Sequence, residues 1–326
     1  MRIHWYLPTK TSEISDLQNS NLASIRLRAL PSIRGLKKKG LEVSHGEENN
    51  PDKRLNAAIF GKLGDPLDVE NRTIRWTEEI KKLKAQGVII VIDYTDHHLL
   101  INSNMTRFYV DNINLADIVT VPSPKMIESL ENLTKSKIVL INDAIEIDVT
   151  YPVKKNNIIK EVLWFGSKSN LKYLVEYLEK IELCSELNIN VLIDKKGMQW
   201  LSATELKNKT KINIKINIWS LVELVEVAKK CDFCIIPSDI SDVRKSGAGA
   251  NRLITSLALG LPVLATNLSS YKPYDEYYLD IEKNNIEKMI RNLDHMQNIV
   301  IQAQRNIIEE FTIEAIGEKW YESIIN

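Results

Sequence analysis

A short stretch of this sequence combines a basic residue, a loop of small residues and the expected start of a helix. It reads KSGAGANRLITSLALGLPVLAT and runs from Lys245 to Thr266. Gly247 and Gly249 would let an anion approach the backbone closely. The first turn of the helix offers unpaired N–H groups and partial positive charge, to which Lys245 and Arg252 add full charges. Together these features predict a binding site for a diphosphate.

The same loop has a plainer interpretation, in which a solvated Lys and Arg flank a flexible turn. It does not match the phosphate-binding loop whose glycines precede a lysine, because Lys245 and Ser246 come before the glycines here. No G-x-G-x-x-G follows the first expected strand of either half of the chain, which argues against a nicotinamide or a flavin. We therefore expect no cofactor.

A second loop of small residues, FGSKSN, contains Gly166, Ser167 and Lys168 and ends at Asn170. It leads from a strand into a helix, and Asn170 is the expected N-cap of that helix. Both loops would then follow strands of one sheet. Because open α/β sheets bind ligands at the carboxyl ends of their strands, we expect the two loops to line one cleft.

The elements that must position these loops are strands and helices that alternate along the chain. In the first half, apolar strands are expected at 2–8, 41–44, 56–61, 88–94, 117–123 and 137–143. In the second half, they are expected at 161–167, 189–194, 213–219, 232–238 and 262–266. Strands separated by amphipathic helices predict parallel sheets that are covered on both faces.

A polar, charged segment at 146–161 breaks this alternation and marks a domain boundary. We predict an N-terminal Rossmann-like domain at 1–150, a C-terminal Rossmann-like domain at 151–305 and a final helical segment at 306–326.

Two local signals refine the second half of the chain. Gly260 fits the left-handed position that ends a helix. A last helix is expected over 303–326, because Ile316, Trp320 and Ile324 recur at four-residue spacing. We expect that apolar stripe to pack across the surface of a domain, and the N-terminal domain is one candidate.

These motifs together resemble the GT-B-fold glycosyltransferases, in particular the large retaining, family-4-like group. FGSxxN paired with KS…NRL…LALGLPVLAT is similar to the C-terminal sugar-donor domain of that group. ASIRLRALPSIRGLKKKGLEV, GVIIVIDYTDHHL, LADIVTVPSPKMIESL and LINDAIEID are similar to segments of its N-terminal half. The resemblance implies an α/β fold with two Rossmann-like, doubly wound domains that face a central cleft.

The implied reaction is transfer of a sugar from a nucleotide-sugar donor without a metal ion, and the chain has no Asp-x-Asp segment. Trp219 ends a strand where the nucleoside base lies in this fold. The expected donor-binding residues are Gly166, Ser167, Lys168, Asn170, Trp219, Lys245, Ser246, Gly247, Ala248, Gly249, Asn251, Arg252 and Thr255.

One departure from the group concerns two carboxylates. Its Glu-x₇-Glu pair would fall at Gly247 and Thr255, where this chain has no acid. Recognition of the donor's ribose, and hence the nucleotide, stays open. A CMP-linked acidic sugar, as used by Kdo transferases of this fold, is an alternative to UDP- or GDP-linked sugars.

The acceptor is expected to meet the N-terminal domain. Arg26 and Asp96 are predicted cleft residues, and His97 is a predicted acid/base group or acceptor contact. The plainer alternatives are that His97 and His98 are ordinary surface histidines and that Arg28 lies on a solvated helix face.

Composition sets further limits on function. Among the 326 residues, 43 basic side chains balance 43 acidic ones, which gives no sign of nucleic-acid binding. The N-terminus does not resemble a signal peptide, and three cysteines suggest a reducing, cytoplasmic location. Cys231 and Cys234 are expected to be structural, not a redox or zinc pair. A basic run offers a surface for anionic lipid at the inner face of the cell membrane: Arg34, Lys37, Lys38 and Lys39.

The leading hypothesis is a glycosyltransferase that builds a bacterial-type surface polysaccharide or glycoconjugate on a glycan or lipid-linked acceptor. A nucleotide-sugar 2-epimerase of the same fold is a second hypothesis, and the missing carboxylates near Thr255 argue against it. A third is a binder of sugar nucleotides that has lost catalysis.

Overall fold

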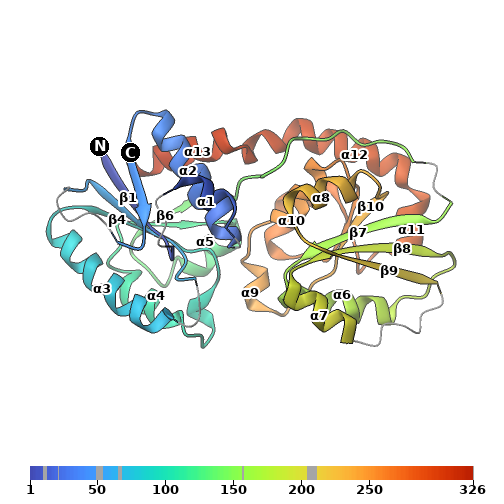
Figure 1. The fold of residues 1–326 in the computed structure, drawn as a ribbon, viewed down its shortest axis with the longest axis horizontal. Helices are drawn as coiled ribbons and strands as arrows, with labels where there is room; N and C mark the ends of the chain where they lie inside the picture. Colours follow the sequence, from blue (N-terminus) through green and yellow to red (C-terminus); the bar gives the residue numbers. More distant parts are fainter. Residues whose placement is uncertain are drawn as a thin grey trace. The chain divides into compact units, whose positions relative to one another are not determined.

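A computed structural model describes residues 1–9, 13–20, 22–48, 54–64, 68–155, 158–203 and 211–325. The chain divides into two compact units (Figure 1). Unit 1 comprises Met1–Ala144, Ser246–Gly249 and Glu310–Asn326, and unit 2 comprises Ile145–Lys245 and Ala250–Glu309.

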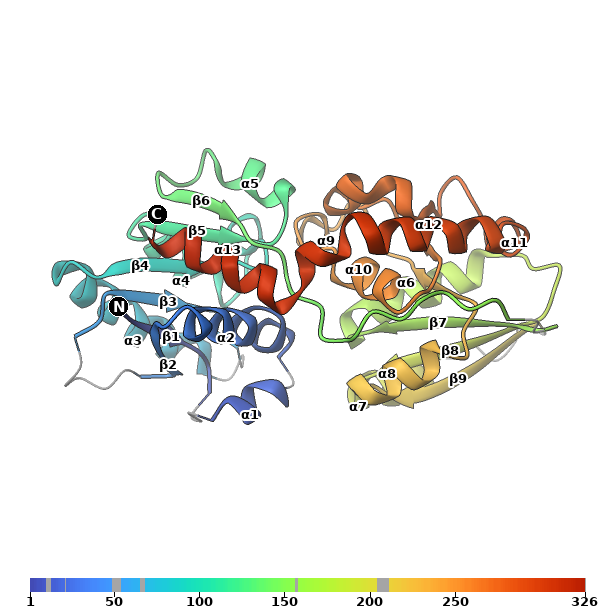
Figure 2. The same cartoon turned by 90° about the horizontal axis from the view of Figure 1, so that it is seen from above.

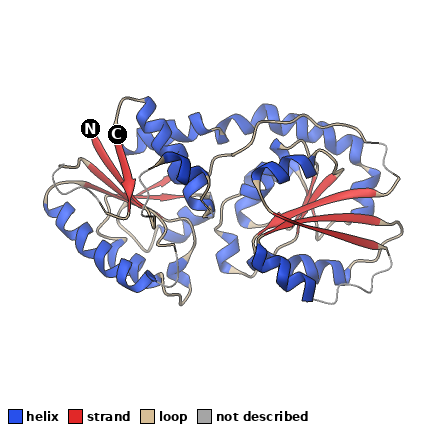
Figure 3. Ribbon diagram, in the orientation of Figure 1, coloured by secondary structure: helices blue, strands red, loops and turns tan. Residues whose placement is uncertain are grey.

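The described part of unit 1 forms a six-stranded parallel sheet in the order β2-β1-β3-β4-β5-β6 (Figure 3). The strands are β1 (Arg2–Tyr6), β2 (Glu42–Gly46), β3 (Ala57–Phe60), β4 (Ile89–Asp93), β5 (Ile118–Val121) and β6 (Lys137–Leu140). Each coincides with a strand predicted from the sequence. The apolar runs of the inner strands β1, β3, β4 and β5 are buried on both sides, as a parallel sheet under two helical layers requires.

Helices cover both faces of this sheet. One face packs on α3 (Val69–Ala85), α4 (Thr106–Asn112) and α5 (Pro124–Leu130), through a core that includes Phe60 and Trp76. The other face packs on α2 (Leu30–Lys38) and α13 (Ile313–Ile325). Shorter elements of this unit are α1 (Ile14–Gln18), the π-helix η1 (Ile25–Ala29) and the 3₁₀ helix η3 (His98–Leu100).

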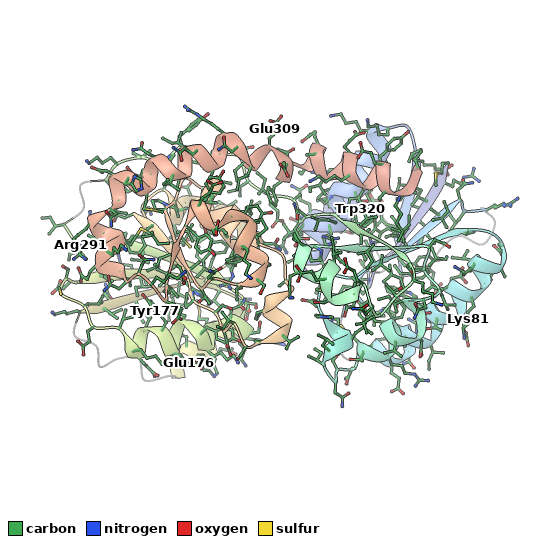
Figure 4. The ribbon with its side chains drawn as sticks, turned by 180° about the vertical axis from the view of Figure 1, so that it is seen from behind. Lys81, Glu176, Tyr177, Arg291, Glu309 and Trp320 are labelled. Atoms are coloured by element: carbon green, nitrogen blue, oxygen red, sulfur yellow. The ribbon has the colours of Figure 1, made fainter. Side chains whose placement is uncertain are left out.

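Two glycines bring α2 and α13 together, and the two helices lie side by side in both ribbon views (Figures 1 and 2). A Cβ placed on Gly35 would lie 2.2 Å from the Cα of Gly317, so the two backbones are in direct contact. Trp320 lies one turn further along α13 (Figure 4). Its ring packs edge-on against that of Trp5 in β1, with ring centroids 4.7 Å apart. The predicted stripe on the last helix is therefore confirmed as a core face.

The single helix predicted over 303–326 is wrong. The chain forms α12 (Leu293–Asn306), then the 3₁₀ helix η6 (Ile308–Phe311), and begins α13 at Ile313. The break has a local cause: Ile308 and Phe311 are buried, and Thr312 accepts a hydrogen bond from the Ala315 N–H at 3.2 Å. A threonine in this capping role starts a new helix.

Unit 2 also has a six-stranded parallel sheet within its described residues, in the order β12-β11-β10-β7-β8-β9. Its strands are β7 (Lys160–Gly166), β8 (Leu187–Ile193), β9 (Ile212–Ile218), β10 (Phe233–Ile236), β11 (Val263–Ala265) and β12 (Leu279–Asp280). Its helices are α6 (Lys168–Lys180), α7 (Lys195–Ala203), α8 (Leu221–Ala228), α9 (Val243–Ser246), α10 (Asn251–Ala258), η5 (Ser269–Tyr277), α11 (Ile286–Arg291) and α12.

The end of α10 follows the prediction. Gly260 has φ +77°, the left-handed conformation expected after a helix. A Cβ there would lie 2.4 Å from the Thr150 carbonyl oxygen, so the lack of a side chain also allows the backbone at Thr150 to pack against Gly260. Across the described ranges, we find no helix with the length and apolarity needed to cross a bilayer.

We expect Gly317→Ala to destabilise the protein. Overpacking a tight contact costs about 1–3 kcal/mol, which exceeds the gain of about 1 kcal/mol from the better helix propensity of alanine. Urea unfolding of this variant, with Glu314→Ala on the exposed side of α13 as control, measures the difference. A Gly317→Ala protein that is more stable than the wild type would contradict the close helix contact.

Candidate donor-side and acceptor-side residues

In unit 2, the two loops predicted to bind the sugar donor are joined by a hydrogen bond. The Lys245 Nζ donates to the Asn170 Oδ1 at 2.6 Å. The loops follow β10 and β7, which are neighbours in the sheet. A second bond ties the same loop to α6, because the Tyr173 hydroxyl donates to the Asp242 Oδ2 at 2.7 Å. Adjacent parallel strands thus bring together residues 75 positions apart in the sequence.

Asn170 is not the N-cap of α6, as the sequence had suggested. Ser167 holds that position without a side-chain cap. Instead, the Asp194 Oδ2 accepts from the Lys168 N–H at 3.1 Å, and its Oδ1 accepts from the Gly197 N–H at 2.8 Å. A carboxylate therefore already occupies the positive end of α6. The sequence analysis missed Asp194, although an acid directly after a buried strand is a usable signal.

Arg252 is half-buried near the start of α10, and its Nη1 has no hydrogen-bond partner among the described residues. Its charge acts on buried Cys234, where burial raises the pKa of the thiol to about 12 and Arg252 opposes that rise. The guanidinium thus reaches toward the interior of unit 2 with one donor unsatisfied. Buried donors in proteins are usually paired, so a buried guanidinium nitrogen without a partner is an unusual feature of this residue.

The remaining predicted donor-side residues of unit 2 lie on β7, on α10 and directly after β9. Gly166 lies at the end of β7, where a Cβ would stand 3.3 Å from the Trp164 ring. Thr255 is partly buried on α10. Trp219 follows β9, an edge strand that β8 separates from β7. Asn251 is the first residue of α10.

The glycine segment at 246–249 belongs to unit 1. The Gly247 carbonyl accepts a hydrogen bond from the Ser123 Oγ at 2.8 Å. A Cβ on Gly247 would lie 2.9 Å from the Met126 Cε, so the end of this flexible side chain packs directly against the glycine. Ala248 and Gly249 are partly buried, and the side chain of Ser246 lies outside the described residues.

In unit 1, Arg28 is the centre of a buried ion network and not a solvated helix residue. Its guanidinium is within 2.5 Å of the Asp93 Oδ1 and 2.8 Å of the Asp143 Oδ1, and it donates to the Ile141 carbonyl at 2.7 Å. Burial opposes its charge, but the two carboxylates outweigh this effect and raise the pKa of Arg28. Asp93 also accepts a hydrogen bond from the Thr120 hydroxyl at 2.7 Å, so its carboxylate is bound by buried groups within the unit.

Asp96 and the two histidines after β4 have different surroundings. Asp96 forms an ion pair with Lys62, a residue that the sequence analysis missed although it directly follows the strand 56–61. His97 and His98 are 1% and 8% exposed, so the alternative of ordinary surface histidines is wrong. Burial lowers the pKa of both imidazoles and keeps them neutral.

Arg26 is 9% exposed in the π-helix η1 and donates to the Ser20 carbonyl at 2.5 Å. The basic run near the end of α2 has varied contacts. Lys39 pairs with Glu318 at 2.6 Å and Arg34 donates to Gln18 at 3.1 Å, while Lys37 and Lys38 are exposed.

Cys231 and Cys234 are free and buried, as a structural role requires. Within the described ranges, no group of three or more histidine, cysteine or acidic side chains is placed to hold a metal ion.

Among the comparisons with known proteins, only the comparison with solved structures gave matches. No protein-family model matches the sequence, and no curated protein matches it either. TarM matches with a TM-score of 0.59 at 15% identity, over 84% of this chain and 56% of TarM, so the chain spans little more than half of that protein. An alpha-glucosyltransferase in complex with UDP and DNA containing an HMU base has a TM-score of 0.60 at 10% identity, with both chains fully covered. The T4 phage beta-glucosyltransferase has a TM-score of 0.57 at 12% identity, again over 100% of both chains.

The fold is that of the GT-B glycosyltransferases. This confirms the predicted pair of Rossmann-like domains. Because one neighbour is named an alpha- and another a beta-glucosyltransferase, the GT-B fold occurs with both stereochemical outcomes.

We expect the Arg28 network to dominate the stability of unit 1. Arg28→Met and Asp93→Leu should each lower the free energy of unfolding by about 3–5 kcal/mol, since the first leaves Asp93 buried without a cation and the second leaves buried Arg28 with Asp143 as its remaining carboxylate in the network. The double variant should cost less than the sum of the two, because both charges are then gone. Urea unfolding measures all three, with the exposed Arg75→Met as control, and strictly additive costs would contradict the coupling.

Proposed function

We propose that this protein is a glycosyltransferase that moves a sugar from a nucleotide-sugar donor to a glycan or lipid-linked glycan. We infer a retaining, metal-independent reaction in the synthesis of a surface polysaccharide or glycoconjugate. The hydrogen bond between Lys245 and Asn170 carries this proposal, because it joins the two loops that were predicted independently to hold the donor. Support also comes from the shared fold, since structural neighbours bind UDP.

The proposed chemistry places the cations at the leaving group. As the bond between the anomeric carbon and the phosphate oxygen breaks, negative charge grows on the departing phosphate. Lys245, Arg252 and the first N–H groups of α10 would stabilise that charge with groups already in position. The acceptor hydroxyl forms the new bond to the anomeric carbon and passes its proton to the departing phosphate.

Asp194 narrows the place where the phosphates can bind. Its carboxylate already accepts from the first N–H of α6, so an anion there would meet a like charge. The start of α10 has no such acid in its first turn and carries Arg252. We therefore assign the diphosphate to α10 and the FGSKSN loop to sugar or nucleoside contacts.

For the cellular location we propose the cytoplasmic side of a membrane, with Arg34, Lys37, Lys38 and Lys39 facing anionic lipid. Because Lys39 already pairs with Glu318, the exposed Lys37 and Lys38 should contribute most. Vesicles with phosphatidylglycerol should then bind the wild type in a salt-dependent manner and bind a Lys37→Gln/Lys38→Gln variant more weakly. Equal binding of both proteins would contradict this assignment.

We expect Arg252→Ala to lower kcat/KM by roughly ten- to a hundredfold, since a charge-assisted hydrogen bond contributes about 1.5–3 kcal/mol. Nucleotide release from UDP-, GDP- and CMP-linked sugars over an acceptor panel measures it. Lys180→Ala, at the opposite end of α6, is the matched loss of one cation and should leave the rate unchanged. A loss below about twofold for Arg252→Ala would remove this residue from the site.

The same assay separates the proposal from the competing functions. Interconversion of UDP-GlcNAc in the absence of an acceptor would indicate an epimerase. Donor binding without turnover over the whole acceptor panel would indicate a non-catalytic binder.

A further inference from the structure

His97 combines a fixed ring with an unused polar atom. Its Nδ1 lies 2.9 Å from the Tyr94 hydroxyl oxygen, and its Nε2 has no hydrogen-bond partner in the described part of the chain. Tyr94 is itself fully buried and packs edge-on against His97 and Tyr109, with ring centroids 5.8 and 4.8 Å apart. The contact between imidazole and phenol is therefore held by packing on both sides.

Counting hydrogens at the Tyr94 hydroxyl decides how this contact is made. A phenol has one hydrogen to donate and can accept two hydrogen bonds. The Leu99 N–H already donates to the Tyr94 oxygen at 2.8 Å. If the His97 Nδ1 also donated to it, the phenol hydrogen would be buried with no acceptor among the described groups, at a cost of about 1–3 kcal/mol. The phenol therefore donates to Nδ1.

This assignment leaves the single proton of the neutral His97 ring on Nε2. The ring is neutral because burial lowers the pKa of His97. An Nε2–H group cannot take up a proton, so His97 is unsuited to act as a base through this atom. The Nε2–H group is instead a buried donor without an acceptor among the described residues. In folded proteins, such groups usually bind a water or a ligand.

The surroundings of His97 indicate which kind of oxygen would fit. Burial alone lowers the pKa of the His97 imidazole, and no charged side chain among the described residues acts on it, so a charged ligand would be buried there without a counter-charge. The Tyr94 ring packs against His97 and the Tyr109 ring packs against Tyr94, which makes the surroundings of the imidazole more apolar. A neutral hydroxyl oxygen suits this environment better than a phosphate.

We propose that Tyr94 is a positioning residue that fixes the Nε2–H tautomer of His97, and that His97 donates a hydrogen bond to a sugar hydroxyl oxygen. The second half of this proposal rests on the proposed function, and the first half does not. The sugar is either the one transferred or the acceptor, and it is bound without a covalent step at His97.

The tautomer can be measured without substrate. The chain has five histidines, so the ring ¹⁵N signals that disappear in His97→Gln identify His97. We expect these signals to report the Nε2–H tautomer in the wild type, and a shift toward Nδ1–H in Tyr94→Phe. A wild-type His97 that carries its proton on Nδ1 would overturn the proposal, whatever the enzyme's activity proves to be.

Activity then tests the role of the donated hydrogen. His97→Gln places an amide N–H near the position of Nε2–H, whereas His97→Asn places it near Nδ1. We expect Gln to keep kcat/KM within about threefold, and Asn, Ala and Tyr94→Phe to lose roughly tenfold, the effect of one neutral hydrogen bond. Thermal unfolding of each variant controls for folding.

The kinetic constants distinguish the two sources of the oxygen. A rise in the KM for the nucleotide sugar in His97→Ala would assign the hydroxyl to the transferred sugar, and a rise in the acceptor KM would assign it to the acceptor. Equal losses above about a hundredfold in His97→Gln and His97→Ala, with both proteins folded, would indicate proton transfer by His97 and contradict a donor role.

Discussion

The hydrogen bond between Lys245 and Asn170 depends on β7 and β10 being neighbours in a parallel sheet. Parallel strands end at a common edge, so two loops that are far apart in the sequence meet wherever their strands pair. The Lys245 ammonium group donates one of its hydrogens in this bond, which holds the group beside the start of α6. A lysine held by an amide is less costly to order around a ligand than a lysine that is free in solvent.

In unit 1, the residues at the ends of the strands are held by a buried ion network instead of a single hydrogen bond. Its sheet ends near Arg28, Asp93 and Asp143, where a buried guanidinium is matched by two carboxylates and a backbone carbonyl. Because Asp93 is committed to that network, the candidate acceptor-side residues after β4 are Asp96 and His97. The network lies directly before the segment from Tyr94 to Leu99, so it supports the segment on which the His97 geometry depends.

Most of the fold could be predicted because strand burial and helix amphipathicity are properties of short segments. The stop at Gly260 follows from backbone sterics alone, and the structure confirms it. The break between α12 and α13 was missed, although Thr312 carried a capping signal, because the apolar pattern continues through it. Periodicity alone therefore overestimated the length of that helix.

Side-chain roles were predictable only where a local rule applied. A solvated helix face was the plainer alternative for Arg28, and it was wrong because nothing nearby in the chain revealed its partners 65 and 115 positions away. The same limit explains why a surface position was kept as an alternative for His97, why Asn170 was taken for a cap and why Lys62 was overlooked. Each of these outcomes depends on strand order, which is a property of the whole sheet.

The central claim is that the start of α10, with Lys245 and Arg252, binds the phosphates of the donor. Isothermal titration of the wild-type protein with a nucleoside diphosphate and with the matching nucleoside, for the uracil, guanine and cytosine series, tests it directly. The account predicts that in at least one series the diphosphate binds far more tightly and loses affinity as salt rises. Equal affinity for nucleoside and diphosphate in every series would contradict it.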